Sequence, residues 1–251
     1  VCQKPTQPPQ KAALKLQNKK ATFNEISPKD LLDIARLYRR GDSVIIPDIN
    51  QTIKIIEYLI ARTNIDAFIK SRALTMKAEL MYEGHGYIKN IIEAKNILRD
   101  LAQQNDITAK EKLAKIFEKE GQYLDAELMY KDIIADGDPI ATLNLAYMYH
   151  HKKIIVPQKI IENYIVLAQN FLLEKLASGQ CDYFGKIGFM YLNLRGLDNN
   201  LKLAARWLLI ASQFDDPKYK QELARLIMQG LLDDINDKPS PELLWRDAAD
   251  L

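Results

Sequence analysis

Cysteine and histidine are scarce in this chain, and their scarcity limits the metal sites that the chain can form. The sequence has two cysteines, Cys2 and Cys181, and three histidines, and no Cys-x-x-Cys pair occurs. A structural zinc site needs four such ligands at short, regular spacing, which these residues do not supply. The adjacent His150 and His151 would point apart on a helix, so they are poorly placed to share an ion. The sequence therefore predicts no metal site.

Motifs for catalysis and phosphate binding are missing as well. No Gly-x-Ser-x-Gly, no His-Glu-x-x-His and no glycine-rich phosphate loop occurs. The acidic pairs Asp215-Asp216 and Asp233-Asp234 stand at expected helix ends, where capping and solubility explain them. We therefore expect no catalytic residue, no cofactor and no small-molecule substrate. An enzyme whose site is assembled from scattered residues is the alternative.

An excess of charge of one sign and long apolar runs are also absent. Lysine and arginine number 35 against 33 acidic residues, a net charge of +2. A nucleic-acid-binding protein would show a basic face, but the basic clusters at residues 11–20 and 36–40 are closely followed by acidic residues. No run of 18 apolar residues occurs, so no transmembrane helix is expected. We expect protein partners and no nucleic acid.

Glycine and proline are few, at 10 residues each, but one small-residue pattern recurs six times. Each small residue is followed two positions later by an apolar residue and three positions later by a large one. Three of them stand seven positions after a proline, at Pro28, Pro139 and Pro217. With 47% hydrophobic residues, this composition favours helices around a buried core. The six small residues are Ala35, Ala78, Ala114, Ala146, Gly188 and Ala224.

The recurring pattern predicts pairs of antiparallel helices. A small residue lets the two backbones of a pair approach, and the large residue beside it fills the groove. Four second helices supply matching alanines, at Ala94, Ala126, Ala205 and Ala248. Helix starts are marked by a capping residue before proline, at Ser27-Pro28, Asp138-Pro139, Asp216-Pro217 and Ser240-Pro241.

The predicted fold class is therefore all-α: an α-solenoid of about six helix-turn-helix repeats in a right-handed superhelix. Each helix pair is apolar on two faces and must stack on its neighbours to bury them. The expected pairs are residues 28–40 with 49–63, 68–83 with 88–104, 108–120 with 122–135, 139–152 with 157–178, 181–193 with 198–214, and 217–230 with 240–250.

The third pair, KLAKIFEKEGQYLDAELMYKDIIADGDP, resembles a tetratricopeptide repeat. The resemblance rests on its first-helix, turn and second-helix positions, which are Leu113, Ala114, Phe117, Gly121, Tyr123, Ala126, Tyr130 and Pro139. The second, fifth and sixth pairs look more like the longer Sel-one-like variant. The positions that carry this likeness most clearly are Ala78, Met81, Tyr82, Gly84 and Ala94, and then Gly188, Tyr191, Gly196, Ala204, Ala205 and Trp207. This resemblance implies an α-solenoid that holds protein partners.

The first 25 residues differ from the rest. The segment VCQKPTQPPQK has no helical period, so residues 1–25 are predicted to be a disordered tether before a single solenoid domain at 26–251. The chain begins at Val1 rather than Met, which we interpret as a processed or truncated product. Cys2 with its polar segment is similar to the start of the bacterial alginate-export outer-membrane repeat lipoprotein. That resemblance implies an acylated Cys2 and a periplasmic, outer-membrane-anchored protein, and the alternative is an incidental thiol.

The function predicted from these patterns is a non-catalytic protein-interaction scaffold, a component of a bacterial envelope assembly for secretion or polysaccharide export. In a solenoid the non-core faces of the first helices line a concave surface that can hold a partner segment. The alternative is a soluble secreted repeat protein that binds host partners. The candidate partner-binding residues on first helices, or just after them, are Arg36, Arg39, Lys77, Glu79, Lys115, Asn144, Tyr147 and His151.

Overall fold

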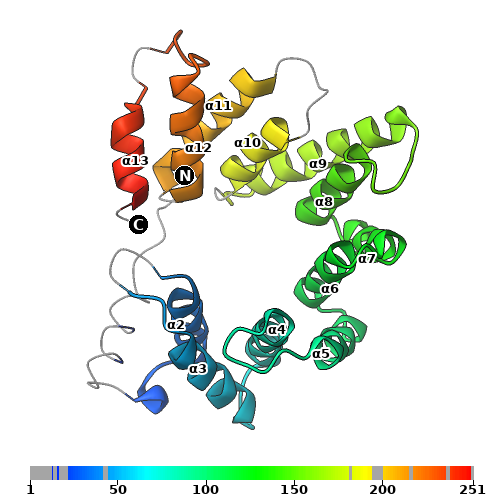
Figure 1. Ribbon diagram of the computed structural model, residues 1–251, viewed down its shortest axis with the longest axis vertical. Coiled ribbons are helices and arrows are strands. Elements are labelled where there is room, and N and C mark those ends of the chain that lie inside the picture. Colours follow the sequence, from blue (N-terminus) through cyan, green and yellow to red (C-terminus); the bar gives the residue numbers. More distant parts are fainter. Residues whose placement is uncertain are drawn as a thin grey trace. The chain divides into compact units, whose positions relative to one another are not determined.

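The computed structural model describes residues 13, 16, 22–41, 45–180, 183–193, 200–214, 217–235 and 238–249. Over these residues it contains α-helices and two short 3-10 helices and no strand (Figure 1), which confirms the all-α prediction. Helix bounds agree with the expected pairs to within a few residues at each end. The α-helices are α2 (Pro28–Arg40), α3 (Ile49–Ala61), α4 (Ala67–Glu83), α5 (Ile91–Gln103), α6 (Ile107–Lys119), α7 (Tyr123–Ala135), α8 (Pro139–His150), α9 (Gln158–Ala177), α10 (Tyr183–Asn193), α11 (Asn200–Ala211), α12 (Pro217–Met228) and α13 (Pro241–Ala249).

The chain divides into two compact units, of which the first ends at Met129 and the second begins at Tyr130. In the first unit α2 packs on α3 and α4 on α5, and the first helix α4 also contacts the first helices α2 and α6. In the second unit the pairs are α8 with α9, α10 with α11, and α12 with α13. Helix pairing thus follows the prediction for these five pairs, while the third predicted pair, α6 with α7, and the hand of the superhelix stay predictions.

Helix starts follow from capping residues whose side chains accept a backbone hydrogen bond. Ser27 accepts from the Asp30 amide at 3.1 Å, and Asp138 accepts from the Ala141 amide at 2.8 Å. Both precede a proline, as the sequence predicts. Other helices begin without a proline, at the caps Asp48, Asp66, Asn90 and Asp106.

All six recurring small residues are buried. Gly188 gives the reason most directly, because a Cβ atom built on it would lie 2.7 Å from Cγ of Leu208 on α11. The first pair lacks a matching alanine on its second helix, and Thr52 takes its place there. Thr52 is fully buried, and its hydroxyl donates to the Asp48 carbonyl at 3.0 Å and lies 3.4 Å from the Ala35 carbonyl. Close backbone approach therefore defines each of these contacts.

The predicted tether, residues 1–25, lies mostly outside the described residues and stays a prediction there. Within it, Ala13 is helical and fully buried, and its carbonyl accepts a hydrogen bond from the Tyr38 hydroxyl at 3.0 Å. Leu16 packs against the same core, and Phe23–Glu25 form a short 3-10 helix. At these positions the segment contacts the first repeat rather than standing away from it. Several residues discussed above, which are Cys2, Cys181, Gly196, Asp215, Asp216 and the side chain of Ala248, lie outside the described residues.

Candidate functional site

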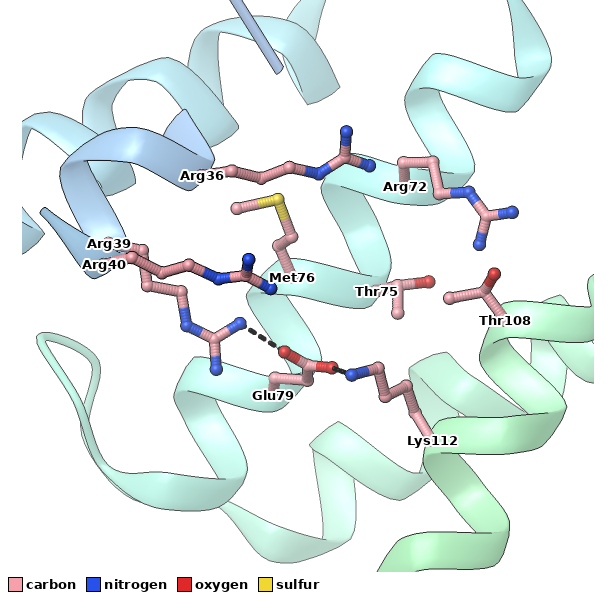
Figure 2. A pocket seen from close by; sticks show the side chains of 9 residues that line it. All are labelled: Arg36, Arg39, Arg40, Arg72, Thr75, Met76, Glu79, Thr108 and Lys112. Carbon is pink, nitrogen blue, oxygen red and sulfur yellow. Dashed lines mark hydrogen bonds and ion pairs between the residues drawn. The ribbon is translucent and has the colours of Figure 1, made fainter. Parts of the chain in front are cut away.

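Two neighbouring hollows open where the first helix α4 contacts the first helices α2 and α6. The larger encloses about 180 Å³ and the smaller about 150 Å³. Residues Arg39, Glu79 and Lys112 line both of them. The larger hollow (Figure 2) is lined by Arg36, Arg39, Arg40, Arg72, Thr75, Met76, Glu79, Thr108 and Lys112.

Positive charge predominates in the lining of the larger hollow. Four arginines and Lys112 face a single carboxylate, that of Glu79. Arg39 and Arg40 come from the last turn of α2, where the partial negative charge of the helix C-terminus favours cations. Arg36 lies one turn earlier, so the 3.6-residue period brings all three toward the same neighbouring helix. The hollow is therefore suited to a negatively charged group.

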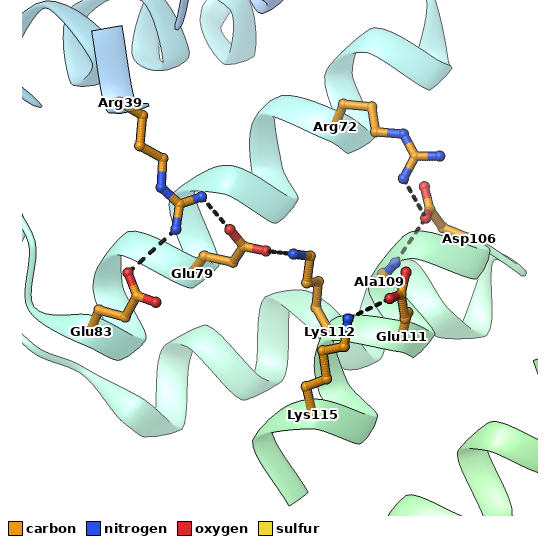
Figure 3. Close-up of polar contacts among 9 residues, drawn as sticks. All are labelled: Arg39, Arg72, Glu79, Glu83, Asp106, Ala109, Glu111, Lys112 and Lys115. Carbon is orange, nitrogen blue, oxygen red and sulfur yellow. Dashed lines mark hydrogen bonds and ion pairs between the residues drawn. The ribbon is translucent and has the colours of Figure 1, made fainter. Parts of the chain in front are cut away.

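Glu79 joins three consecutive first helices (Figure 3). Its carboxylate accepts a hydrogen bond from Arg39 on α2 and pairs with Nζ of Lys112 on α6 at 2.5 Å. A second guanidinium nitrogen of Arg39 lies 3.3 Å from the Glu83 carboxylate. Burial raises the pKa of Glu79, but Lys112 and Arg39 together outweigh it and hold the pKa below its ordinary value. Glu79 is thus a charged bridge across the inner layer of the first unit.

Arg72 is less completely hydrogen-bonded than Glu79. Its buried Nη1 lies 3.5 Å from Oδ1 of Asp106 and makes no hydrogen bond in the described part of the chain. Both oxygens of Asp106 are already engaged, because Oδ1 accepts from the Ala109 amide at 2.9 Å and Oδ2 accepts from the Ser71 hydroxyl. Burial lowers the pKa of the Arg72 guanidinium, while Asp106 opposes that change. Arg72 therefore keeps donor capacity that its surroundings do not use.

Four of the candidate residues come together at these hollows, and one of them, Glu79, is the charged bridge described above. Arg36 and Arg39 line the larger one, and Lys115 lines the smaller one, where it pairs with Glu111 at 2.6 Å. Lys77 does not join them, because its ammonium pairs with Glu57 on α3 at 2.9 Å and lies 5.6 Å from the centre of the Tyr87 ring.

The sequence reasoning missed Arg40, Arg72 and Lys112. The helical period carries a usable signal for two of them. Arg40 is four residues after Arg36, and Lys112 is three residues before Lys115, so each shares a helix face with a candidate residue. Nothing in the local sequence marks Arg72, whose environment comes from α6.

The remaining candidates belong to the second unit and lie at the end of α8. Tyr147 is 46% exposed, and its ring centroid lies 3.8 Å from that of His151. The His151 Nδ1 atom also lies 2.9 Å from the Tyr147 carbonyl oxygen, so the two side chains form one aromatic surface. Asn144 differs, since its Nδ2 atom is buried without a hydrogen-bond partner among the described residues. Tyr147 is therefore not a core residue, and whether it binds a partner stays a prediction.

Other kinds of site are not evident in the described part of the chain. No group of three or more His, Cys, Asp or Glu side chains is arranged to hold a metal ion there. None of the described helices combines the length and the apolar character that crossing a bilayer requires.

Comparison with solved structures identifies the fold. The crystal structure of a Sel1 repeat protein from Oxalobacter formigenes superposes with a TM-score of 0.53 at 20% identity, over 89% of this chain and 87% of that one. A protective antigen of uropathogenic Escherichia coli strains, which displays an SLR fold, gives a TM-score of 0.47 at 15% identity, over 94% of this chain and 48% of that one. No family model matches the sequence, and no curated protein is similar to it.

Proposed function

We propose, from the Sel1-like repeat fold of this chain, that it is a non-catalytic scaffold which holds other proteins of a multi-component assembly. The observation that carries the proposal is the pair of hollows on α2, α4 and α6, where three consecutive repeats present charged side chains to one surface. A segment lying across the first helices would contact all three repeats at once. Cationic side chains outnumber acidic ones in the lining of the two hollows, so the partner segment is expected to be acidic.

The contacts around Glu79 support a binding surface that exists before the partner arrives. Because Arg39, Glu79 and Lys112 hold one another, their side chains lose little further freedom on binding. Among the described residues Arg36, by contrast, pairs only with Asp33, which lies one turn earlier on the same exposed helix face, at 2.6 Å. Such exposed pairs contribute little to stability, so Arg36 can exchange Asp33 for a partner carboxylate at low cost.

The experiment that tests this proposal compares partner capture by charge-reversed variants. Arg36→Glu combined with Lys115→Glu removes two cations from the hollows and leaves the Glu79 bridge intact. Arg99→Glu is the matched control, since Arg99 is exposed on the second helix α5 and donates a hydrogen bond to Asn96 on the same helix. We expect quantitative mass spectrometry of cross-linked complexes from the native host to show loss of specific partners with the double variant alone. Equal recovery with all three proteins would contradict the scaffold surface proposed here.

The assembly in question is proposed to belong to a bacterial envelope, with the scaffold in the periplasm and anchored to the outer membrane through a lipid on Cys2. Support comes from the resemblance of the first residues to an alginate-export lipoprotein. If Cys2 is acylated, the product from its native host should incorporate labelled palmitate and sediment with membranes. Cys2→Ser should abolish both properties while the circular dichroism spectrum stays helical. An unlabelled wild-type product in the supernatant would exclude the anchor without affecting the binding surface.

A further inference from the structure

The larger hollow keeps hydrogen-bond donors that the protein itself does not satisfy. Among the described residues no carboxylate pairs with Arg40, and Arg72 Nη1 makes no hydrogen bond. The one ion pair of Arg36 within the described part of the chain is its exposed pair with Asp33. These three arginines come from α2 and α4 and line one cavity, in which Glu79 is the one acidic lining residue, so like charges are held near one another. Arg36 indeed acts to lower the pKa of Arg72, as a neighbouring positive charge must.

A buried hydroxyl in the same lining also lacks a partner. Thr75 is the most buried of the lining residues, at 3% exposure, and its Oγ1 atom has no hydrogen-bond partner among the described residues. Figure 2 shows this hydroxyl pointing toward the side of the hollow where Thr108 and the Arg72 guanidinium lie. A buried polar group without a partner is unfavourable, and such groups are uncommon in proteins unless a ligand or ordered water satisfies them.

The number and type of donors favour one chemistry of ligand. A carboxylate offers two oxygens, whereas a phosphate-type group offers three or four and carries more charge. Three guanidinium groups, Lys112 and the hydroxyls of Thr75 and Thr108 supply more donors than two oxygens can use. The volume of about 180 Å³ corresponds to roughly six water molecules at about 30 Å³ each, enough for one such group.

We propose that the hollow between α2, α4 and α6 binds a tetrahedral oxyanion, a phosphate-type group held by Arg36, Arg40 and Arg72 with the Thr75 hydroxyl beneath it. The inference deepens the scaffold function proposed above, because a partner that carries such a group would be recognised at this position. Arginine suits this task, since its planar guanidinium donates two parallel hydrogen bonds to one oxyanion. No carboxylate of the described residues has to leave Arg40 when the group enters.

Acidic side chains near the hollow compete with the ligand for the arginines. Asp106 lies 3.5 Å from Arg72, Asp33 lies 2.6 Å from Arg36, and Glu111 also faces Arg72. The first distance is too long for a normal hydrogen bond, and the second pair is exposed to solvent. Glu79 is held by Arg39 and Lys112, so it remains in place beside the bound anion.

The test titrates the full-length protein with inorganic phosphate at constant ionic strength, followed by calorimetry and by the arginine Nε–Hε signals in nuclear magnetic resonance. Sodium acetate and sodium chloride serve as comparison anions. We expect saturable phosphate binding with shifts confined to arginines of the hollow. Arg40→Gln and Arg72→Gln should each weaken it about tenfold, the scale of one charge-assisted hydrogen bond. Arg99→Gln, outside the hollow, should bind as the wild type does.

Thr75→Val keeps the side-chain shape and removes the unpartnered hydroxyl. In phosphate-free buffer its melting temperature should equal or exceed that of the wild type, while phosphate affinity falls several-fold. A purely structural Thr75 would instead lose stability and leave phosphate affinity unchanged, and that result would overturn the assignment. If acetate binds as well as phosphate, or if phosphate binds no better than chloride, the tetrahedral site is likewise refuted.

A second arm identifies the source of the group. Peptides containing one phosphoserine among acidic residues are compared with their unphosphorylated forms and with free phosphate. A phosphopeptide that binds at least tenfold more tightly than free phosphate, and loses this gain with Arg40→Gln, supports a partner segment as the source. Equal affinities support free phosphate as the ligand. Because the capture experiment above measures proteins and this one measures the anion, failure of either can be recognised separately.

Discussion

The first helices of the two units carry very different side chains on the same kind of repeat. In the first unit α2, α4 and α6 are joined by ion pairs, with Glu79 at the centre. In the second unit the contacts are between aromatic rings. The ring centroids of Phe189 on α10 and Tyr219 on α12 are 5.5 Å apart, and the Tyr147 ring stacks on that of His151. Both units nevertheless bury a small residue at every expected anchor. The buried small residues thus determine the fold, and the side chains on the surfaces between them can differ from unit to unit.

Enlarging an anchor should produce the largest effect and should do so in both units. Gly188→Leu forces a side chain into a position where Cβ alone would lie 2.7 Å from Leu208. We expect it to reduce the free energy of unfolding by about 3 kcal/mol, the upper part of the usual range for over-packing. Ala114→Leu in the first unit should cost about 1–3 kcal/mol. Chemical denaturation measures the free energy of unfolding of each variant. Lys115→Leu, on the same helix as Ala114, should change this free energy little.

Removing the Glu79 bridge should affect the first unit alone. Glu79→Gln leaves the partly buried Arg39 and Lys112 beside a neutral group, which should cost about 2 kcal/mol. Hydrogen exchange should become faster in α2, α4 and α6 while the amides of α10 and α12 keep their protection. Asp33→Asn removes an exposed pair of the same α2 face and should cost less than about 1 kcal/mol. Equal losses for the two variants would show that the bridge has no special role.

Truncating the aromatic surface of the second unit should change binding rather than stability. Tyr147 is 46% exposed, so Tyr147→Ala should leave the melting temperature nearly unchanged. If α8 holds a partner, the same variant should weaken capture by about 1–2 kcal/mol, the scale of an interface anchor. The measurement is an affinity titration with the partner recovered from the native host. A loss of several kcal/mol of folding stability would instead place Tyr147 in the core.

Acid should weaken the first unit slightly through Glu79. The folded-state pKa of Glu79 lies below its ordinary value of 4.5, so its contribution to stability is present above about pH 4.5 and is lost as pH falls through the folded pKa. The loss follows because protonation of Glu79 removes the negative charge that pairs with Arg39 and Lys112. Denaturation between pH 3 and pH 6 should show this dependence in the wild type and a smaller one in Glu79→Gln. Identical profiles would exclude Glu79 as the titrating group.

The fold could be predicted from the sequence because its determinants are local and periodic. Small residues such as Ala114 and caps such as Ser27 act within one helix or one helix pair, so their spacing is visible along the chain. The binding surface could be predicted only in part, since it depends on which helix each polar face meets. Arg39 reaches across to α4, whereas Lys77, equally polar on its own helix, turns toward α3. The unpartnered Thr75 hydroxyl could not be foreseen, because its isolation results from packing between repeats.

Asp106 connects the start of a helix to the charge state of the hollow beside it. The oxygen that accepts the Ala109 amide, and so begins α6, is the same one that lies 3.5 Å from Arg72. If the Arg72 guanidinium moves away, the hydrogen bond from the Ala109 amide to Oδ1 of Asp106 should become stronger. If the guanidinium moves nearer, that hydrogen bond should become weaker. The chemical shift and the exchange rate of the Ala109 amide proton should therefore report on movement of the Arg72 guanidinium.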